Sequence, residues 1–248
     1  MSAELLTLRE GNVLQIKMNR PEKKNAVTGV MYRGMVEALQ EADRDDAIGA
    51  VVVTGGGNCF TSGNDISDFL LAGLDKEAPG VLFLKTLATC ETPIVAGVEG
   101  VAVGIGTTMI FHCDLVYAAP TALFRMPFVD LGLVPEAGSS LLVPRCVGFA
   151  KTTELLMLGD SFGAEEAVRL GIANAVVASD RLLGFAMDKA AQLAAKPRKA
   201  LAATRRLIRG DTQLLLRRID EELERFAAAL QTDEARSAFN AFLARKAG

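Results

Sequence analysis

The stretch that most constrains the fold covers residues 93–106, with the sequence Pro-Ile-Val-Ala-Gly-Val-Glu-Gly-Val-Ala-Val-Gly-Ile-Gly. Its first part, Ile94 to Val98, is an apolar run typical of a buried strand. Three glycines then interrupt the run, and Thr107 to His112 can form a short apolar helix. A strand that leads through glycines into a helix leaves free main-chain N–H groups facing one point. Such a point can bind a phosphate or stabilise an oxygen that becomes negative during a reaction.

The glycines of this stretch do not by themselves choose between these uses. They do not form G-x-G-x-x-G, and no acidic residue follows at the right distance on a second strand, so a dinucleotide site is disfavoured. They can also serve only to let a helix pack closely on a sheet. The stretch therefore predicts an α/β architecture, and its chemical role stays open at this point.

A second junction of the same kind precedes it. Ala50 to Thr54 is a β-branched apolar run that predicts a central strand. Ser62-Gly63-Asn64 suits a sharp turn, and Asp65 suits the first turn of a new helix. In a parallel sheet, the junctions near Gly63 and Gly104 both lie at the carboxyl ends of their strands, where ligands usually bind. We therefore expect the two junctions to form one ligand site.

The rest of the chain divides into an α/β part and a helical part. Leu5 to Arg9 and Val13 to Met18 predict a hairpin, and Thr28 is a candidate cap for a helix that continues to about Ala42. From Ser179 on, strands disappear and Ala, Leu, Arg and Glu dominate. We place a boundary near residue 190, with a core of 1–190 and a C-terminal helical region of 191–248. Such a region either packs against a neighbouring subunit or covers its own core.

Composition excludes several classes of function. The formal net charge of −3 argues against nucleic acid as the main partner. No run reaches the roughly 18 uncharged residues needed to cross a bilayer, and no signal peptide is visible, so no membrane partner is expected. The four cysteines form no C-x-x-C pair, so we expect neither a metal site nor a disulfide scaffold, and a reducing cytoplasm fits best.

Histidine chemistry is also disfavoured. His112 is the only histidine, and it stands beside Phe111 and Cys113 in an apolar segment, where a core or surface role is expected rather than a catalytic one. A Ser-His-Asp hydrolase therefore has little support. The sequence Gly138-Ser139-Ser140 also lacks the second glycine of G-x-S-x-G.

Glu136 is the carboxylate that stands out. It follows Leu-Val-Pro and precedes Ala-Gly, so few polar neighbours are available in the sequence. Poor solvation favours the neutral carboxyl and makes its ionised form a better base. The alternative is a glutamate that only interacts with a helix dipole near the helix N-terminus. Composition alone leaves both interpretations open.

Several segments resemble, in order and over nearly the whole chain, the crotonase superfamily of enoyl-CoA hydratases and isomerases. These segments are Asn19-Arg20-Pro21 with Asn25-Ala26, Phe-Thr-Ser-Gly-Asn-Asp-Ile at 60–66, Pro-Ile-Val-Ala-Gly-Val-Glu-Gly at 93–100, and Leu-Gly-Leu-Val-Pro at 131–135. The resemblance implies a β-β-α spiral core, a helical C-terminal region used in trimerisation, and a coenzyme A thioester as substrate. It implies a homotrimer or a hexamer built as a dimer of trimers, with no cofactor beyond the coenzyme A of the substrate.

The resemblance also assigns roles to residues at both junctions. The main-chain N–H groups of Asn64 and Ile105 correspond to the oxyanion hole of the family. The segment from Ser62 to Ile66 would line the acyl-CoA site, and the loop from Lys23 to Ala26 would approach the coenzyme from the other side. The implied substrate-binding residues are Lys24, Ala26, Ser62, Gly63, Asp65, Ile66, Gly104, Thr108 and Phe128.

Departures from the family pattern indicate the reaction. The two glutamates that activate water in the hydratases would fall at Thr108 and Phe128, and neither residue can do acid–base work. Glu136 instead stands where the Δ3,Δ2-enoyl-CoA isomerases carry their single catalytic glutamate. The resemblance therefore implies an isomerase that moves the double bond of 3-enoyl-CoA to trans-2-enoyl-CoA. The alternatives are a hydratase, another acyl-CoA enzyme such as a thioester hydrolase, and a non-catalytic acyl-CoA-binding or RNA-binding member.

Overall fold

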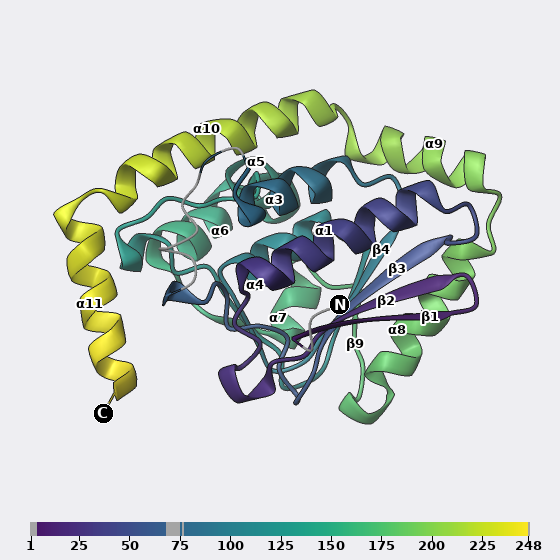
Figure 1. Ribbon diagram of the computed structural model, residues 1–248, viewed down its shortest axis with the longest axis horizontal. Helices are drawn as coiled ribbons and strands as arrows, with labels where there is room; N and C mark the ends of the chain where they lie inside the picture. Colours follow the sequence, from purple (N-terminus) through teal and green to yellow (C-terminus); the bar gives the residue numbers. More distant parts are fainter. Residues whose placement is uncertain (1–3, 68–74, 76, 248) are drawn as a thin grey trace.

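A six-stranded sheet forms the centre of the computed structural model, which describes residues 4–67, 75 and 77–247 (Figure 1). Its strand order is β1-β2-β3-β4-β6-β9. The first pair is antiparallel and the other neighbours are parallel. The strands are β1 (Leu5–Glu10), β2 (Val13–Met18), β3 (Ala50–Gly55), β4 (Ile94–Val98), β6 (Leu115–Ala118) and β9 (Ala175–Val176). The predicted hairpin is the β1–β2 pair.

Helices cover both faces of this sheet, and the alternation of side chains in the strands decides which residues meet them. In β3, Val51 and Val53 belong to the core that includes α1 (Gly29–Arg44) and α3 (Pro79–Thr89). Val52 belongs to the smaller core against α8 (Ser179–Ala194). Both faces are therefore apolar, as expected of parallel strands between helical layers, and the predicted α/β class is confirmed.

The stretch 93–106 passes from the first sheet to a second. β4 leads directly to β5 (Val101–Val103), which pairs with β7 (Leu123–Arg125), and β7 pairs with β8 (Phe162–Gly163). At the crossing, Gly100 has φ +61°, and a Cβ there would lie 2.3 Å from the carbonyl oxygen of Asn58. Only glycine fits this approach. After β5 the chain enters α4 (Ile105–Thr108) and the 3-10 turn η2 (Met109–His112).

The remaining elements are helical. They are η1 (Pro21–Lys23), η3 (Val129–Leu131), α5 (Ser139–Val147), α6 (Phe149–Thr153), the π-helical η4 (Glu154–Leu158), α7 (Ala164–Arg169), α9 (Arg198–Arg209), α10 (Thr212–Leu230) and α11 (Asp233–Ala247). α9 and α10 pass over the top of the molecule, and α11 descends on one side (Figure 1). The boundary expected near residue 190 falls within α8, which packs on the sheet. None of the described helices is long and apolar enough to cross a membrane.

Arg205 connects the C-terminal helical region to the sheet through hydrogen bonds. Arg205 of α9 is buried, and it donates from Nε to Oδ1 of Asp114 at 2.8 Å and from Nη1 to the carbonyl of Cys90 at 2.6 Å. The other oxygen of Asp114 accepts from the N–H of Ile94 at 2.8 Å. α9 is thus tied to the point where β4 begins.

Asn25 fastens two loops at the opposite end of the sheet. Its side chain is fully buried, and its backbone adopts a left-handed φ of +53°. Its amide donates to the carbonyls of Gly56 at 2.8 Å and Cys59 at 2.6 Å, and its oxygen accepts from the N–H of Arg20 at 2.8 Å. The loop before α1 is therefore held against the loop after β3.

Replacement of Asn25 tests this attachment. We expect Asn25→Ala to lower the free energy of unfolding by about 1–3 kcal/mol, because buried polar groups lose their partners. Urea unfolding measures the change. Asn25→Gly removes the same hydrogen bonds but tolerates the positive φ, so it should lose nearly as much. A glycine variant as stable as the wild type would show that backbone strain, and not the amide, explains the loss.

Candidate active site

The two predicted junctions lie against each other. Thr61 forms a parallel bridge with Ala102, in which its N–H donates to Val101 at 2.9 Å and its carbonyl accepts from Val103 at 3.0 Å. The segment that ends in Ser62-Gly63-Asn64 thus pairs with the strand that leads into Gly104 and Ile105. This observation joins two stretches that are about forty residues apart in the chain.

Two glycines permit this close approach. A Cβ at Gly63, which has φ +93°, would lie 2.9 Å from the carbonyl oxygen of Val103. A Cβ at Gly106 would lie 2.6 Å from Cγ2 of Thr61. Larger residues at either position would push the junctions apart. The glycines singled out in the sequence therefore set the spacing between the segment at 61–64 and the start of α4.

Within the described part of the chain, no main-chain carbonyl accepts from the N–H groups of Asn64 and Ile105. On its far side, Asn64 forms a parallel bridge with Val27, which uses the carbonyl of Gly63 and the N–H of Asp65 at 2.8 and 2.9 Å. In such a bridge the N–H of the middle residue points away from its partner. Ile105 is the first residue of α4, and the first N–H groups of a helix have no partner inside it. The junction thus offers two main-chain donors from adjacent segments.

Glu136 is buried beside α4. It lies between η3 and α5 with 7% of its surface exposed, and its Oε1 accepts a hydrogen bond of 2.5 Å from Thr108, the last residue of α4. Burial raises the pKa of Glu136 from 4.5 to about 8, and the negative charge of Glu222 adds to the rise, while the Thr108 hydrogen bond opposes it. This carboxyl is therefore a strong base when ionised.

The turn that carries Glu136 has an unusual backbone. Ala137 and Gly138 adopt left-handed φ values of +62° and +69°, and the alanine conformation is costly for an L-residue. Ser139 donates from Oγ to the carbonyl of Glu136 at 2.6 Å. Glu222 of α10 accepts from the N–H of Gly138 at 2.6 Å. One hydrogen bond within the turn and one from α10 therefore stabilise its conformation.

His112 also supports this turn. It is buried, and its Nε2 lies 2.7 Å from the carbonyl oxygen of Ala137, which can only accept, so Nε2 carries the proton. Burial lowers the pKa of His112 to about 4, so the ring is neutral. The expectation of a non-catalytic histidine is consistent with this position in the core.

Tyr32 belongs to the same site, although the sequence did not single it out. Its hydroxyl donates to Oδ1 of Asn64 at 2.5 Å, and its ring lies 5.2 Å from that of Phe83. Burial, and then the charge of Glu136, raise the pKa of Tyr32 well above its usual value. Its place next to Met31, on the buried face of an amphipathic helix, is the only signal that could have found it.

Two segments of the predicted acyl-CoA site lie in direct contact. Ser62 donates from its N–H to the carbonyl of Lys24 at 2.9 Å, so the segment at 62–66 and the loop at 23–26 are neighbours. Lys24 is exposed with a left-handed φ of +50°, and Ala26 is buried. The carbonyl of Gly104 accepts from Thr107 and Thr108 and so begins α4.

Three predicted residues have structural partners elsewhere. Asp65 forms an ion pair of 2.7 Å with Arg20, and Ile66 packs half-buried against the core. The helix expected to begin at Asp65 is seen at Ile66 and Ser67, and the residues that follow lie outside the described part of the chain. Phe128 lies in the core and precedes η3, and the described contacts do not join it to Glu136. Among the described residues, no group of three or more His, Cys, Asp or Glu could hold a metal ion.

Comparison with known proteins identifies the family. A model described as enoyl-CoA hydratase/isomerase matches residues 9–247. The chain belongs to the enoyl-CoA hydratase/isomerase family. A crystal structure of an enoyl-CoA hydratase/isomerase from Pseudoalteromonas atlantica superposes with a TM-score of 0.93 and 37% identity, and the match covers 98% of this chain and 97% of that one. The predicted crotonase-like fold is thereby confirmed.

The relatives carry names from both branches of this family. Enoyl-CoA delta isomerase 2 of Rattus norvegicus is 34% identical over 253 residues, which cover 99% of this chain and 64% of the rat protein. The chain thus spans less than two thirds of that relative's length. A probable enoyl-CoA hydratase of Rhizobium meliloti is 34% identical over 248 residues, 98% of this chain and 95% of that protein. An acyl-CoA enzyme of this family is therefore supported, and the reaction must be argued from the site.

The burial of Glu136 predicts a pH-dependent difference in stability. Its pKa is about 8 in the folded protein against 4.5 as the usual value, so the folded state holds a proton that the unfolded state releases. The free energy of unfolding of the wild type therefore falls as pH rises from 4.5 to about 8, the interval between the two pKa values. Relative to wild type, Glu136→Gln should gain stability by at most about 1.4 kcal/mol per pH unit.

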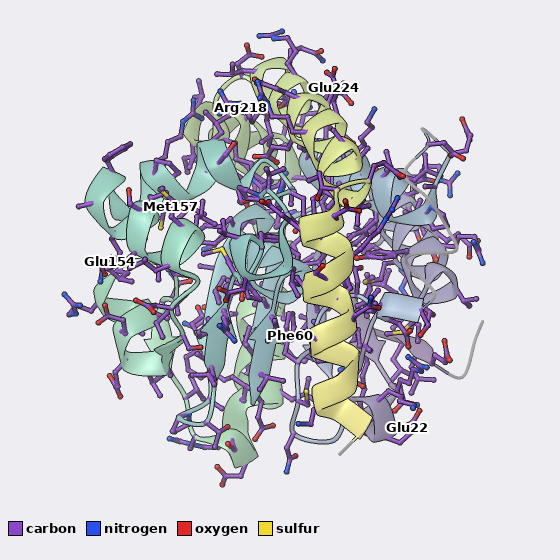
Figure 2. The ribbon with its side chains drawn as sticks, turned by 90° about the vertical axis from the view of Figure 1, so that its left-hand side faces the viewer. Glu22, Phe60, Glu154, Met157, Arg218 and Glu224 are labelled. Atoms are coloured by element: carbon purple, nitrogen blue, oxygen red, sulfur yellow. The ribbon has the colours of Figure 1, made fainter. Side chains whose placement is uncertain are left out.

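Urea unfolding at about pH 5 and about pH 8 measures this difference. Glu224→Gln, on the exposed side of α10 (Figure 2), controls for the loss of one negative charge at the surface. A difference between Glu136→Gln and wild type that stays constant across the window would contradict the raised pKa.

Proposed function

We propose that the chain converts 3-enoyl-CoA to trans-2-enoyl-CoA, in the breakdown of fatty acids or related acyl-CoA compounds. The observation that carries this proposal is the buried carboxylate of Glu136, which accepts a hydrogen bond from Thr108. The resemblance places the first glutamate of the hydratases at position 108, so the partner of the base here is a hydroxyl and not a second acid. A single base is sufficient for isomerisation, whereas hydration also needs a group to position and activate water.

In the proposed mechanism, the thioester oxygen accepts hydrogen bonds from the N–H groups of Asn64 and Ile105. Glu136 removes a proton from C2, and the electron pair spreads over a dienolate whose negative charge rests mainly on that oxygen. Each donor stabilises this charge by about 3–4 kcal/mol. The protonated Glu136 then returns the proton to C4, and the double bond moves to C2–C3. Atoms and charge balance without any further reactant.

The coenzyme would be held by the segments that carry Lys24, Ala26 and Ser62 to Ile66. Their hydrogen bond between Ser62 and Lys24 supports one continuous binding surface beside the two donors. The close approach of Gly63 to Val103 of β5, and the hydrogen bond of 2.9 Å from the N–H of Gly104 to Arg125 of β7, support a surface next to the reaction centre. Thr108 and Phe128 are buried, which supports a wall that keeps water from the new double bond.

The homotrimer, or a hexamer built as a dimer of trimers, stays a prediction. Large apolar side chains lie exposed on α6, η4 and α9. Phe149 is 83% exposed, Met157 is 63% exposed on the outer surface (Figure 2), and Leu207 is 85% exposed. Exposed apolar residues of this size are typical of surfaces that another subunit covers, and light scattering gives the assembly directly.

Ultraviolet spectroscopy with trans-3-hexenoyl-CoA tests the reaction. Absorbance of the conjugated 2-enoyl thioester should rise with wild type, and the rate should fall by about 10²–10⁴-fold in Glu136→Gln, because the base is lost. If 3-enoyl-CoA is inert and 2-enoyl-CoA loses absorbance instead, the enzyme is a hydratase and the proposal is wrong.

The raised pKa of Glu136 predicts that activity in the same assay increases toward alkaline pH. Proton removal needs ionised Glu136, and the pKa of that carboxyl is about 8. The ratio kcat/KM for trans-3-hexenoyl-CoA should therefore rise with pH and level off above about 8, since this ratio reports the free enzyme. A profile that is already flat from about pH 5 upward would show that the base ionises normally.

A further inference from the structure

A second buried carboxylate, from the C-terminal helical region, reaches the turn that carries Glu136. Glu222 of α10 is 4% exposed. It accepts hydrogen bonds from the N–H of Gly138 at 2.6 Å, the N–H of Ser140 at 2.9 Å and the hydroxyl of Ser140 at 2.5 Å. All its donors lie within four residues after Glu136, while Glu222 itself is more than eighty residues away in the chain.

These contacts hold a conformation that the turn does not favour alone. Ala137 and Gly138 are both left-handed, and this conformation is unfavourable for an alanine because its Cβ approaches the following carbonyl oxygen. α10 also leaves no room at Gly138, where a Cβ would lie 2.4 Å from Cδ1 of Leu215. The direction of the Glu136 side chain therefore depends on how α10 packs.

The polar groups around Glu222 favour its ionised form. Burial raises the pKa of Glu222, and its hydrogen bonds to Ser140 and Gly138 and the charge of Arg218 oppose that rise. Arg218 lies one turn earlier on α10, where it donates to the hydroxyl of Ser140 at 3.2 Å and pairs with Glu221 at 3.3 Å. Three donors on one carboxylate favour its charged form.

Glu136 faces a different set of groups. Thr108 of α4 donates to it, Tyr32 of α1 interacts with its charge, and Glu222 of α10 repels it. His112 contacts the same turn through the carbonyl of Ala137, but the ring is neutral because burial lowers its pKa to about 4, assisted by the charges of Arg209 and Arg205. Glu222 is therefore the negative charge that acts on Glu136.

We propose that Glu222 is a positioning residue for the proposed isomerisation: it fixes the turn that directs Glu136, and its charge makes Glu136 a stronger base. The inference rests on the proposed function for its kinetic part only. Two nearby carboxylates in unlike surroundings ionise at different pH, since the better solvated or better bonded one ionises first and hinders the other. Glu222 is the better bonded carboxylate, which ionises first, and Glu136 is the one whose ionisation it hinders.

Glu222→Gln tests both effects. The amide keeps the size of the side chain, removes the charge, and directs N–H groups at main-chain donors of the turn. We expect the pKa of Glu136 to fall and kcat for trans-3-hexenoyl-CoA to fall by up to about a hundredfold, with KM changed less. Infrared difference titration of the Glu136 carboxyl band, assigned with Glu136→Gln, gives the pKa without any turnover.

Two further variants separate charge from position. Glu224→Gln removes an exposed carboxylate from the same helix and should leave the Glu136 titration at its wild-type value. Glu222→Asp keeps the charge but shortens the side chain. It should keep the raised pKa of Glu136 while lowering kcat. If the glutamine variant does not fold, a wild-type kcat in Glu222→Asp overturns the positioning role.

The pKa of Glu136 and the kcat of the variants decide the proposal. A lower pKa of Glu136 in Glu222→Gln than in wild type and Glu224→Gln supports the proposal. In Glu222→Gln, a Glu136 pKa that stays at the wild-type value overturns the proposal, and so does a kcat that stays at the wild-type level. If wild type isomerises no 3-enoyl-CoA, the proposed function fails, while the infrared titration still decides whether Glu222 acts on Glu136.

Discussion

The burial of the Glu136 carboxyl is the constraint on which the rest of the site depends. A carboxyl that is cut off from water must either stay protonated or find partners, and here Thr108 supplies one hydrogen bond while burial dominates. The surrounding structure keeps the carboxyl in this position at a cost in stability that grows once it ionises. The burial of Glu136 therefore lowers the stability of the fold and raises the basicity of this carboxylate, a combination often found at functional sites.

Close backbone contacts provide the second half of the site. Gly63 and Gly106 allow the segment after β3 and the start of α4 to approach so closely that two main-chain N–H groups lie on adjacent segments. Main-chain donors of this kind do not depend on side-chain identity, so an isoleucine at position 105 is compatible with the proposed role of its N–H group as an oxyanion donor. The donors are also preorganised, because the bridges at Thr61 and Asn64 fix the segment on both sides.

The sequence allowed much of this to be predicted, and the reason differs between residues. Apolar runs and alternation located β3 and β4, and the glycines located the two junctions. Glu136 was visible because its neighbours in the chain are apolar. Tyr32 and Glu222 were not visible, because their importance comes from packing between elements far apart in the sequence. Glu222 in particular stands in a helix rich in charged residues, where sequence periodicity alone gives no reason to single it out.

The attachment of α10 to the turn at 136–140 also bears on how the chain matures. A ribosome makes the residues of the sheet, both glycine junctions and Glu136 well before it makes Glu222, and domains fold in that order during synthesis. A nascent chain that lacks α10 would have its base on an unsupported turn. Under the proposed function, activity would then appear only after α10 docks on the turn that carries Glu136.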